Sequence, residues 1–452
     1  MHSLRTPLSE SVIWQWQKAG YQNLGTKAWT EGGVPFYLTN HPKIAQKYAQ
    51  IALMYLLENK NILNSSEPLI FLELGSGLGK LSFYLLQEIS KWVTQGLLKD
   101  FSIKYIISDI SEKNCQFWQN HKAFKPFIDQ GILDFALFDP TQDDILLTLN
   151  NEQILLKNNP LIVFANYYFD SIPQDIYLVK DHRVYQGELD VEADTASENP
   201  LLEKELPYQL IFDQMICPPF EIERLMELIP NSSYITYPTA GFQTLENLKK
   251  ICNSNILMLT GDKAQFNHKQ MDWKKQPPIT FHTTVSFTVN FELLKMRCLD
   301  QHGFVCLPQH FDELFSIALL QWGPSFSVAS ASKTYEDFDH WSLQNHNSML
   351  DFLEKKEQPT LGELNLLLKF DSFDPFNFFF YNEKIKQALK HASFREKEDL
   401  IFAIQTAKKL FFATKKEEAI LLVNMASLLL TLNQQLDAFV LLKEAAELNS
   451  EF

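Results

Sequence analysis

A glycine turn and the polar residues around it are the parts of this 452-residue sequence whose types and spacing can do chemistry. Residues 73–79 read E-L-G-S-G-L-G and stand between an apolar run and a helical pattern. Because glycine has no Cβ, such a turn lets the backbone approach a ligand closely, and the following helix offers free N–H donors. The sequence therefore predicts a pocket for a nucleotide-like ligand.

The spacing of the glycines argues against the two common phosphate-binding motifs. The dinucleotide fingerprint needs a glycine at position 80, where Lys80 stands, and a P-loop needs Ser or Thr after that lysine, where Leu81 stands. Asp109 lies 30 residues beyond Gly79, instead of the ~20 typical of dehydrogenases. A nicotinamide dehydrogenase is therefore only a third hypothesis.

The elements that must position these residues are buried strands, each followed by a polar side chain. Apolar runs at 69–72, 105–107, 135–138 and 161–164 predict strands, and Asp109, Asp139 and Asn166 follow three of them. In an open parallel sheet, ligands bind at the carboxyl ends of the strands. We also expect a helix over 44–56, a fifth strand at 256–259, and an edge hairpin formed by 281–289 and 304–307.

The pattern E-x-G-x-G-x-G resembles motif I of class I S-adenosylmethionine-dependent methyltransferases. This cofactor carries an amino group, a sulfonium and a ribose diol, and carboxylate side chains are suited to bind these groups. We expect Glu73 to recognise its amino-acid end, Asp109 its ribose hydroxyls and Asp139 its adenine edge. The expected cofactor-binding set is Glu73, Gly75, Ser76, Gly77, Gly79, Asp109, Ile110, Asp139 and Asn166.

A wider resemblance covers about residues 20–325. Residues 164–173, F-A-N-Y-Y-F-D-S-I-P, resemble the A-N-E-F-F-D-A-L-P signature of the MidA family, which includes the mitochondrial complex I assembly-factor arginine methyltransferase. Residues 37–44 and 288–304 resemble two further segments of that family, in the same order. The resemblance implies an α/β fold with a seven-stranded Rossmann-like methyltransferase sheet and an N-terminal helical addition.

The same resemblance implies methyl transfer to a protein or peptide, with an arginine side chain as a candidate acceptor. It places Asn166, Tyr167 and Asp170 in the catalytic site, where Asp170 would pair with a guanidinium. The family has Glu at position 167 and D-Y-G where this chain has Thr260, Gly261 and Asp262. The alternative hypothesis is therefore a catalytically degenerate methyltransferase fold that serves as a binding or assembly module.

Composition excludes several other classes. With 40 Lys and Arg against 55 Asp and Glu, the net charge is −15, which argues against nucleic acid or an anionic membrane as the general partner. Residues 184–206 hold seven of these carboxylates and one lysine, and a basic peptide is one candidate partner for them. The five cysteines and eleven histidines show no disulfide framework or metal spacing. We see no targeting segment or apolar span and expect a cytoplasmic protein.

The C-terminal part of the chain has a different composition, which is rich in Leu, Ala, Lys and Glu. We expect an N-terminal helical addition at 1–65, a methyltransferase domain at 66–330, a linker at 331–362 and a helical domain at 363–452. Predicted helices near 398–413, 416–431 and 434–448 give a repeat of 36 residues, close to a tetratricopeptide unit. This TPR-like domain is a candidate site for a protein partner, and an unrelated helical bundle is the other interpretation.

Overall fold

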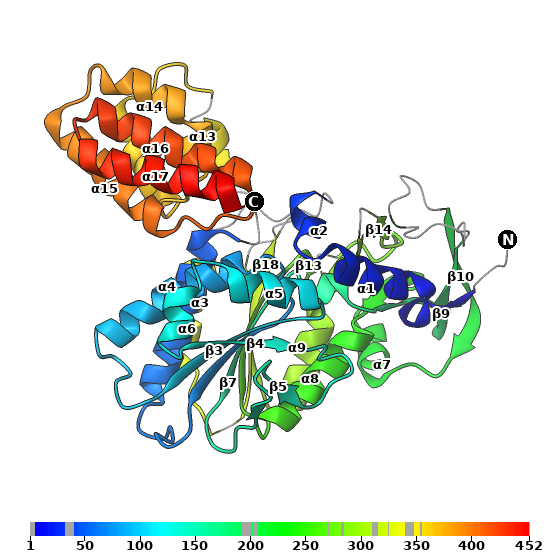
Figure 1. Ribbon diagram of the computed structural model, residues 1–452. Helices are drawn as coiled ribbons and strands as arrows, with labels where there is room; N and C mark the ends of the chain where they lie inside the picture. Colours follow the sequence, from blue (N-terminus) through cyan, green and yellow to red (C-terminus); the bar gives the residue numbers. More distant parts are fainter. Residues whose placement is uncertain are drawn as a thin grey trace. The chain divides into compact units, whose positions relative to one another are not determined.

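The computed structural model describes residues 5–31, 40–191, 201, 207–269, 271–281, 284–309, 315–323, 325–339, 348–352 and 355–451. The chain forms two compact units. The first contains residues 1–39 and 47–342, and the second contains residues 40–46 and 343–452. Figure 1 shows a sheet flanked by helices in the first unit and helices alone in the second.

A seven-stranded mixed sheet is the centre of the first unit. Its strands, in spatial order, are β17 (Phe304–Cys306), β18 (Ser316–Trp322), β12 (Ile256–Asp262), β7 (Leu161–Asn166), β2 (Leu69–Glu73), β3 (Ile103–Asp109) and β4 (Leu133–Leu137). The last five are parallel, and β18 runs antiparallel to both of its neighbours. The strand order reverses between β2 and β7, which is where open α/β sheets bind ligands. The predicted class I methyltransferase fold is confirmed.

Helices cover both faces of this sheet, which explains why its strands are apolar throughout. On one face Leu72 shares a core with Leu245 of α8. On the other face the ring of Phe164 stacks on Tyr48 of α3 at 5.8 Å. The helices of this unit are α1 (Val12–Leu24), α2 (Lys27–Thr30), α3 (Pro42–Glu58), α4 (Lys80–Thr94), α5 (Glu112–Asn120), α6 (Lys125–Asp129), α7 (Phe220–Met226), α8 (Thr239–Ile251), α9 (Phe291–Asp300) and α10 (Ala329–Asp339).

A second, antiparallel sheet was not predicted. Its five strands are β1 (Thr6–Pro7), β8 (Asp175–Lys180), β9 (Arg183–Val191), β10 (Tyr208–Ile216) and β11 (Ser233–Tyr237). The first part of the acidic stretch is therefore strand β9, in which Glu188 pairs with Arg5. The rest of that stretch, apart from residue 201, lies outside the described residues.

The predicted edge hairpin was wrong. β17 pairs with β18, and Thr280–Phe281 (β14) pairs with Val285–Ser286 (β15) instead. β18 runs from Ser316 to Trp322 and is buried along its whole length, so it had the apolar signal of a strand. The remaining short strands are β5 (Leu146–Leu147) with β6 (Gln153–Ile154), and β13 (Ala264–Gln265) with β16 (Val289–Asn290).

The second unit is helical. Its helices include α12 (Leu361–Phe370), α13 (Asn377–Phe380), α14 (Asn382–Leu389), α15 (Phe394–Lys409), α16 (Ala419–Thr431) and α17 (Gln435–Glu451). Ala419, Ala426, Ala438 and Ala445 all lie in its core, where small side chains let helices approach closely. The tetratricopeptide assignment and the domain boundaries stay predictions. Within the described ranges, no helix has the length and apolar character needed to cross a bilayer.

His41 and Asp371 join the two separate segments of this helical unit. The Lys43 N–H donates to His41 Nδ1 at 3.1 Å, so the ring proton lies on Nε2, which donates to Asp371 Oδ1 at 2.7 Å. Asp374 lies close enough for these three residues to resemble a metal site. However, a metal on Nε2 would move the remaining ring proton to Nδ1, where the Lys43 N–H already donates. We interpret the cluster as a buried hydrogen-bonded tie.

We predict that Asp371→Ala destabilises the helical unit by about 2–4 kcal/mol, because His41 and Asn377 both lose a buried acceptor. The measurement is urea unfolding of the full chain. Asp437→Ala is the matched control, since Asp437 makes an exposed contact with Gln405 and should cost about 0.5 kcal/mol or less. Equal effects of the two variants would contradict the tie.

Candidate functional site

Four strands of the large sheet deliver polar side chains to one edge. β2 ends at Glu73, β3 at Asp109, β7 at Asn166 and β12 at Asp262. The three carboxyl groups are buried, with at most 4% of each residue exposed. Burial of a charged group is costly unless a partner compensates it, so the contacts of each one decide what this edge can bind.

Glu73 is held by two hydroxyl groups. Ser82 Oγ and Tyr105 OH each donate to Glu73 Oε2 at 2.5 Å. Burial raises the pKa of Glu73 to about 7, although these two hydrogen bonds lower it, and the nearby Asp109 raises it further. The carboxyl group of Glu73 is therefore partly protonated near neutral pH. A positive ligand at this edge would favour its charged form.

Asp109 fixes the glycine turn from the neighbouring strand. Its Oδ2 accepts the Gly77 N–H at 3.0 Å, and its Oδ1 accepts the Ser111 N–H at 2.9 Å. Burial raises the pKa of Asp109, although these backbone hydrogen bonds act in the opposite direction. Each carboxylate oxygen keeps a further acceptor position. Asp109 can thus hold the turn and accept ligand hydroxyl groups at the same time.

The glycine turn has the left-handed backbone that its sequence predicts. Gly75, Gly77 and Gly79 have φ values of 58°, 53° and 73°. Beyond Gly79, Lys80 begins α4. Ser76, which lies between Gly75 and Gly77, donates its hydroxyl to the Glu73 carbonyl at 3.3 Å. The turn therefore presents backbone, with few side chains, toward the strand edge.

Gly77 also meets an aromatic ring from outside the sheet. A Cβ on Gly77 would lie 2.8 Å from Cζ2 of Trp29, so only glycine fits under this indole. Trp29 stacks on Tyr21 of α1, with ring centroids 5.5 Å apart. Trp118 of α5 donates its indole N–H to the Gly77 carbonyl at 3.1 Å. Two tryptophans thus define the space around this glycine.

Helix α1 lies along the carboxyl edge (Figure 1). Its successive turns contact two predicted site residues, Asp139 and Ile110, and Ser171, which follows the predicted Asp170. Gln17 donates to the Ser171 carbonyl at 2.6 Å. Lys18 forms an ion pair with Asp139 at 2.7 Å, and Gln22 donates to the Ile110 carbonyl at 3.4 Å. Asp139 is therefore already paired with a lysine. The N-terminal addition forms a cover over this edge.

Asn166 and Tyr167 lie among aromatic rings. Tyr48 OH donates to Asn166 Oδ1 at 2.7 Å. Tyr167 has a φ of 48°, which is strained for a bulky residue, and its ring stacks on Phe315 at 5.5 Å. A Cβ on Gly261 would collide with Phe315 and Tyr48, so glycine is required beside them. Strain of this kind is typical of functional sites.

Asp170 and Asp262 form a pair of buried acids next to Asn166. The Asp170 N–H donates to Asp262 Oδ1 at 3.2 Å. Burial raises the pKa of Asp170, whereas the charge of Lys263 lowers it. Burial also raises the pKa of Asp262, and the negative charge of Asp170 raises it further. Two adjacent buried carboxyl groups do not both ionise readily, so the pair carries one negative charge more easily than two.

The structure thus brings the predicted residues to one edge but surrounds them with residues that the sequence analysis did not assign. The unassigned residues are Lys18, Tyr21, Trp29, Tyr48 and Asp262. Asp262 carried a usable signal, because it follows the fifth apolar run as Asp109 follows the second. The others belong to helices that reach the edge only through the tertiary fold.

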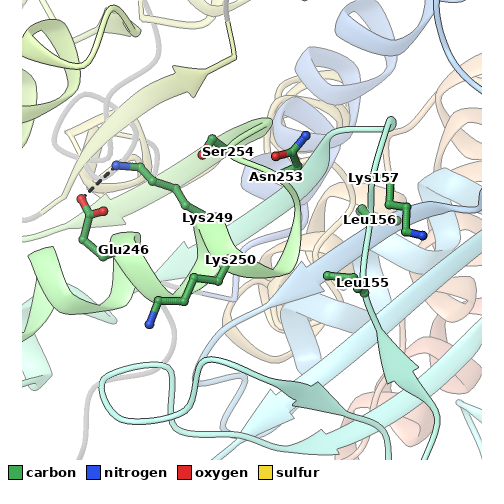
Figure 2. A pocket seen from close by; sticks show the side chains of 8 residues that line it. All are labelled: Leu155, Leu156, Lys157, Glu246, Lys249, Lys250, Asn253 and Ser254. Atoms are coloured by element: carbon green, nitrogen blue, oxygen red, sulfur yellow. Dashed lines mark hydrogen bonds and ion pairs between the residues drawn. The ribbon is translucent and has the colours of Figure 1, made fainter.

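A separate groove lies at the opposite end of the strands. Its volume is about 680 Å³, and its lining comes from residues 155–157, which precede β7, and from residues 246–254 (Figure 2). Lys249 points toward Glu246, 3.0 Å away, and Lys250 pairs with Asp144 at 2.9 Å. These lysines already have acidic partners, and we do not include the groove in the candidate site.

No protein-family profile matches the chain, and no curated protein matches it. Similar solved structures include an uncharacterised protein from Burkholderia thailandensis, at 12% identity and a TM-score of 0.43, covering 72% of this chain and 90% of that one. A second protein of the same superfamily and organism, bound to S-adenosyl-homocysteine, has 12% identity, a TM-score of 0.44 and coverages of 70% and 88%. The N-methyltransferase NodS from Bradyrhizobium japonicum, in complex with S-adenosyl-homocysteine, has 9% identity, a TM-score of 0.31 and coverages of 68% and 99%.

We predict that Gly77→Ala destabilises the protein more than Gly131→Ala. Both glycines have positive φ, but a Cβ meets Trp29 only at Gly77, whereas Gly131 faces open space. The backbone penalty of about 1 kcal/mol is common to both, and the collision adds about 1–3 kcal/mol at Gly77. Thermal unfolding of the two variants measures the difference. Adding the Trp29→Ala substitution should restore part of the lost stability in the Gly77→Ala variant but not in the Gly131→Ala variant.

We predict that Glu73→Gln gains stability relative to the unmodified chain as the pH rises from 4 to 8. A folded-state pKa raised to about 7 gives stability that is fully present below the unfolded pKa and is lost as the pH rises through 7. Glutamine does not titrate, so the difference in unfolding free energy should change by about 3 kcal/mol. Chemical unfolding at several pH values measures it. The exposed Glu112→Gln should show no such trend.

Proposed function

We propose that this chain is an S-adenosylmethionine-dependent methyltransferase that acts on a protein or peptide. The observation that carries the proposal is the gathering of Glu73, Asp109, Asp170 and Asp262 at the carboxyl edge of a methyltransferase sheet. Burial raises the pKa of all four. A ligand with a sulfonium and an ammonium group would offset their charge, whereas a phosphate-rich dinucleotide would add to it.

Orphaned polar atoms beside Asp109 support the fit of an adenosine moiety. Ser111 Oγ and Asn114 Oδ1 are buried without a hydrogen-bond partner. Such atoms cost about 1–3 kcal/mol each unless a ligand satisfies them. They stand at the start of α5, next to the carboxylate that we assign to the ribose hydroxyls.

We assign the cofactor site to the predicted set, with one change of role. Glu73 and the turn at 75–79 would hold the amino-acid end, and Asp109 with Ile110 the ribose and its surroundings. Asp139 pairs with Lys18, so we propose that this ion pair closes α1 over the adenine end. When bound, S-adenosylmethionine supplies a methyl group on a positively charged sulfur.

The acceptor side lies at Asn166, Tyr167 and Asp170. Among the described residues, no hydrogen bond to the Asp170 carboxylate is found, although only 6% of the residue is exposed. A buried carboxylate without a donor suits a basic acceptor such as an arginine side chain, in line with the resemblance to the MidA family. Asn166, fixed by Tyr48, would orient the acceptor, and Asp170 would accept the proton that it loses.

We further propose that the helical unit selects the protein partner. Its helices α16 and α17 expose large apolar side chains, with Leu436 83% and Phe439 66% exposed. Exposed apolar residues of this size are typical of interaction surfaces. Under this proposal, the first unit carries out the chemistry, and a tetratricopeptide-like unit at 363–452 captures the substrate or an assembly partner.

We predict that the purified chain binds S-adenosyl-homocysteine in calorimetry and that Asp109→Asn weakens binding at least tenfold. Asparagine keeps the size of the side chain but offers one acceptor oxygen instead of two. Asp129→Asn, a change of the same type at an exposed position, should leave binding unchanged. If the unmodified chain binds neither S-adenosyl-homocysteine nor S-adenosylmethionine, the proposed function fails.

We predict that the chain transfers labelled methyl from S-adenosylmethionine to a polypeptide in a cell lysate. Asn166→Ala should abolish transfer, because the acceptor loses the side chain that orients it. Binding of S-adenosyl-homocysteine should persist in this variant. Cofactor binding without transfer to any polypeptide would favour the degenerate binding module.

A further inference from the structure

Helix α17 of the helical unit is apolar on two opposite faces. Its inner face, which includes Ala438, Leu441 and Ala445, packs in the core of that unit. Its outer face carries Leu436 and Phe439, which are 83% and 66% exposed. A helix that is apolar on all sides is typically buried on all sides. The exposure of the outer face therefore indicates a surface that a partner covers.

The exposed side chains of this outer face have the spacing of a helix-pairing surface. Residues at i, i+3, i+4 and i+7 share one side of a helix, and here they are Leu436, Phe439, Val440 and Lys443. The charge of Lys443 is balanced on the same helix, because its ammonium group pairs with Glu447 at 3.9 Å. The outer face is thus largely apolar, and this pair leaves it without net charge.

Helix α16, which leads into α17 through residues 432–434, has the same character. Its residues 419–431 include no Asp, Glu, Lys or Arg, although 21% of the chain is charged. The surface of a soluble domain is usually about 25–35% charged. Three apolar residues of α16 are nevertheless 39–49% exposed, namely Ile420, Val423 and Leu430. A surface of this kind favours an uncharged apolar partner over an acidic or a basic one.

The outer face of α17 is complementary to a second copy of itself. When two copies of the helix pair antiparallel at the height of Leu441, each residue faces the one equally far beyond this height. Leu436 then lies opposite Ala446, so that a large side chain meets a small one. Phe439 lies opposite Lys443, and an ammonium group over an aromatic ring is a favourable contact. Each pair occurs twice, as a two-fold symmetric interface requires.

The exposed area is sufficient for a small dimer interface. At roughly 150–250 Å² per large apolar side chain, the outer face leaves about 500 Å² uncovered through Leu436, Phe439, Val440 and Leu442. Two copies would therefore bury about 1,000 Å² through these side chains alone, which is close to the lower bound for a specific interface. An interface of this size is typical of weak, reversible association.

We propose that the outer face of α17 is a self-association surface, through which two copies of the chain form an antiparallel, two-fold symmetric dimer. A second copy is thereby the partner of the helical unit, whose role in partner selection rests on the proposed function; the association itself needs no cofactor. The net charge of −15 opposes the approach of two copies, and a face without net charge reduces this repulsion locally. Salt should strengthen the dimer, because it screens the repulsion while the apolar contact persists.

Sedimentation velocity of the full chain over a range of concentrations tests the dimer. We expect association with a dissociation constant on the order of micromolar, which tightens as salt is raised from about 0.05 M to about 0.5 M. Phe439→Glu should weaken association at least tenfold, because it places a charge in the contact twice. Phe394→Glu is the matched control, since Phe394 is 78% exposed at the start of α15, and it should leave association unchanged.

Circular dichroism of both variants checks that their helices are intact, as expected for changes at exposed positions. A chain that stays monomeric at every concentration would overturn the proposal. A dimer that Phe439→Glu does not weaken, or that weakens as salt is added, would overturn it too. Because no cofactor is used, a chain that dimerises but binds no S-adenosyl-homocysteine would contradict the proposed function alone.

The antiparallel register has a separate test. When the helices pair at the height of Leu441, the two copies of Val440 lie close together, whereas the two copies of Glu447 lie about 18 Å apart along the helix axis. A short bismaleimide should therefore cross-link Val440→Cys into a dimer but not Glu447→Cys. The unmodified chain, with its five cysteines, gives the background. Equal cross-linking at the two positions would indicate a parallel pair and overturn the antiparallel dimer.

Discussion

The burial of several carboxyl groups at one edge of the large sheet is the constraint on which the rest of this structure depends. Parallel strands end together, and here four of them end in polar side chains, three of which are buried carboxyl groups. Each buried carboxyl needs donors, which the chain supplies from hydroxyl groups and backbone N–H groups. Tyr105, Ser82 and Thr260 are therefore as much a part of the edge as the acids themselves. Under the proposed function, this incomplete compensation favours a cationic ligand.

The sequence was informative wherever a local pattern determines the structure. Apolar runs identified the parallel strands, because strands buried on both faces are apolar throughout, and the glycine spacing identified a turn with left-handed backbone. The second sheet was missed for a physical reason. From Gly187 to Val191, β9 buries alternate residues, and the half-buried positions between them carry Glu188 and Asp190, two of the acidic residues that dominated the interpretation of this stretch. Trp29 and Lys18 could not be found, because their contacts with Gly77 and Asp139 join segments distant in sequence.

Tyr167 shows how one substitution relative to a family pattern changes the character of a site. The position has a strained backbone and follows strand β7 directly, so its side chain is held in a defined place. A carboxylate at position 167 would be a second partner for a basic acceptor, besides Asp170. The phenol ring of Tyr167 stacks on Phe315 instead. Under the proposed function, Tyr167 adds no negative charge to the acceptor side, where Asp170 and Asp262 are the carboxyl groups. Aromatic rings beside a carboxylate can contact the face of a flat cationic group while the carboxylate binds the edge of that group.

The tie between His41 and Asp371 has a consequence for how the chain is made. The two residues are 330 positions apart, yet they belong to the same compact unit. At translation rates of about 5–20 residues per second, His41 waits roughly 15–65 s before its partner is synthesised. During that interval His41, which directly precedes α3, lacks the carboxylate that accepts the hydrogen bond from its Nε2–H. The helical unit is therefore completed only after the residues between its two segments have been synthesised, and it includes residues made about 330 positions before their partners.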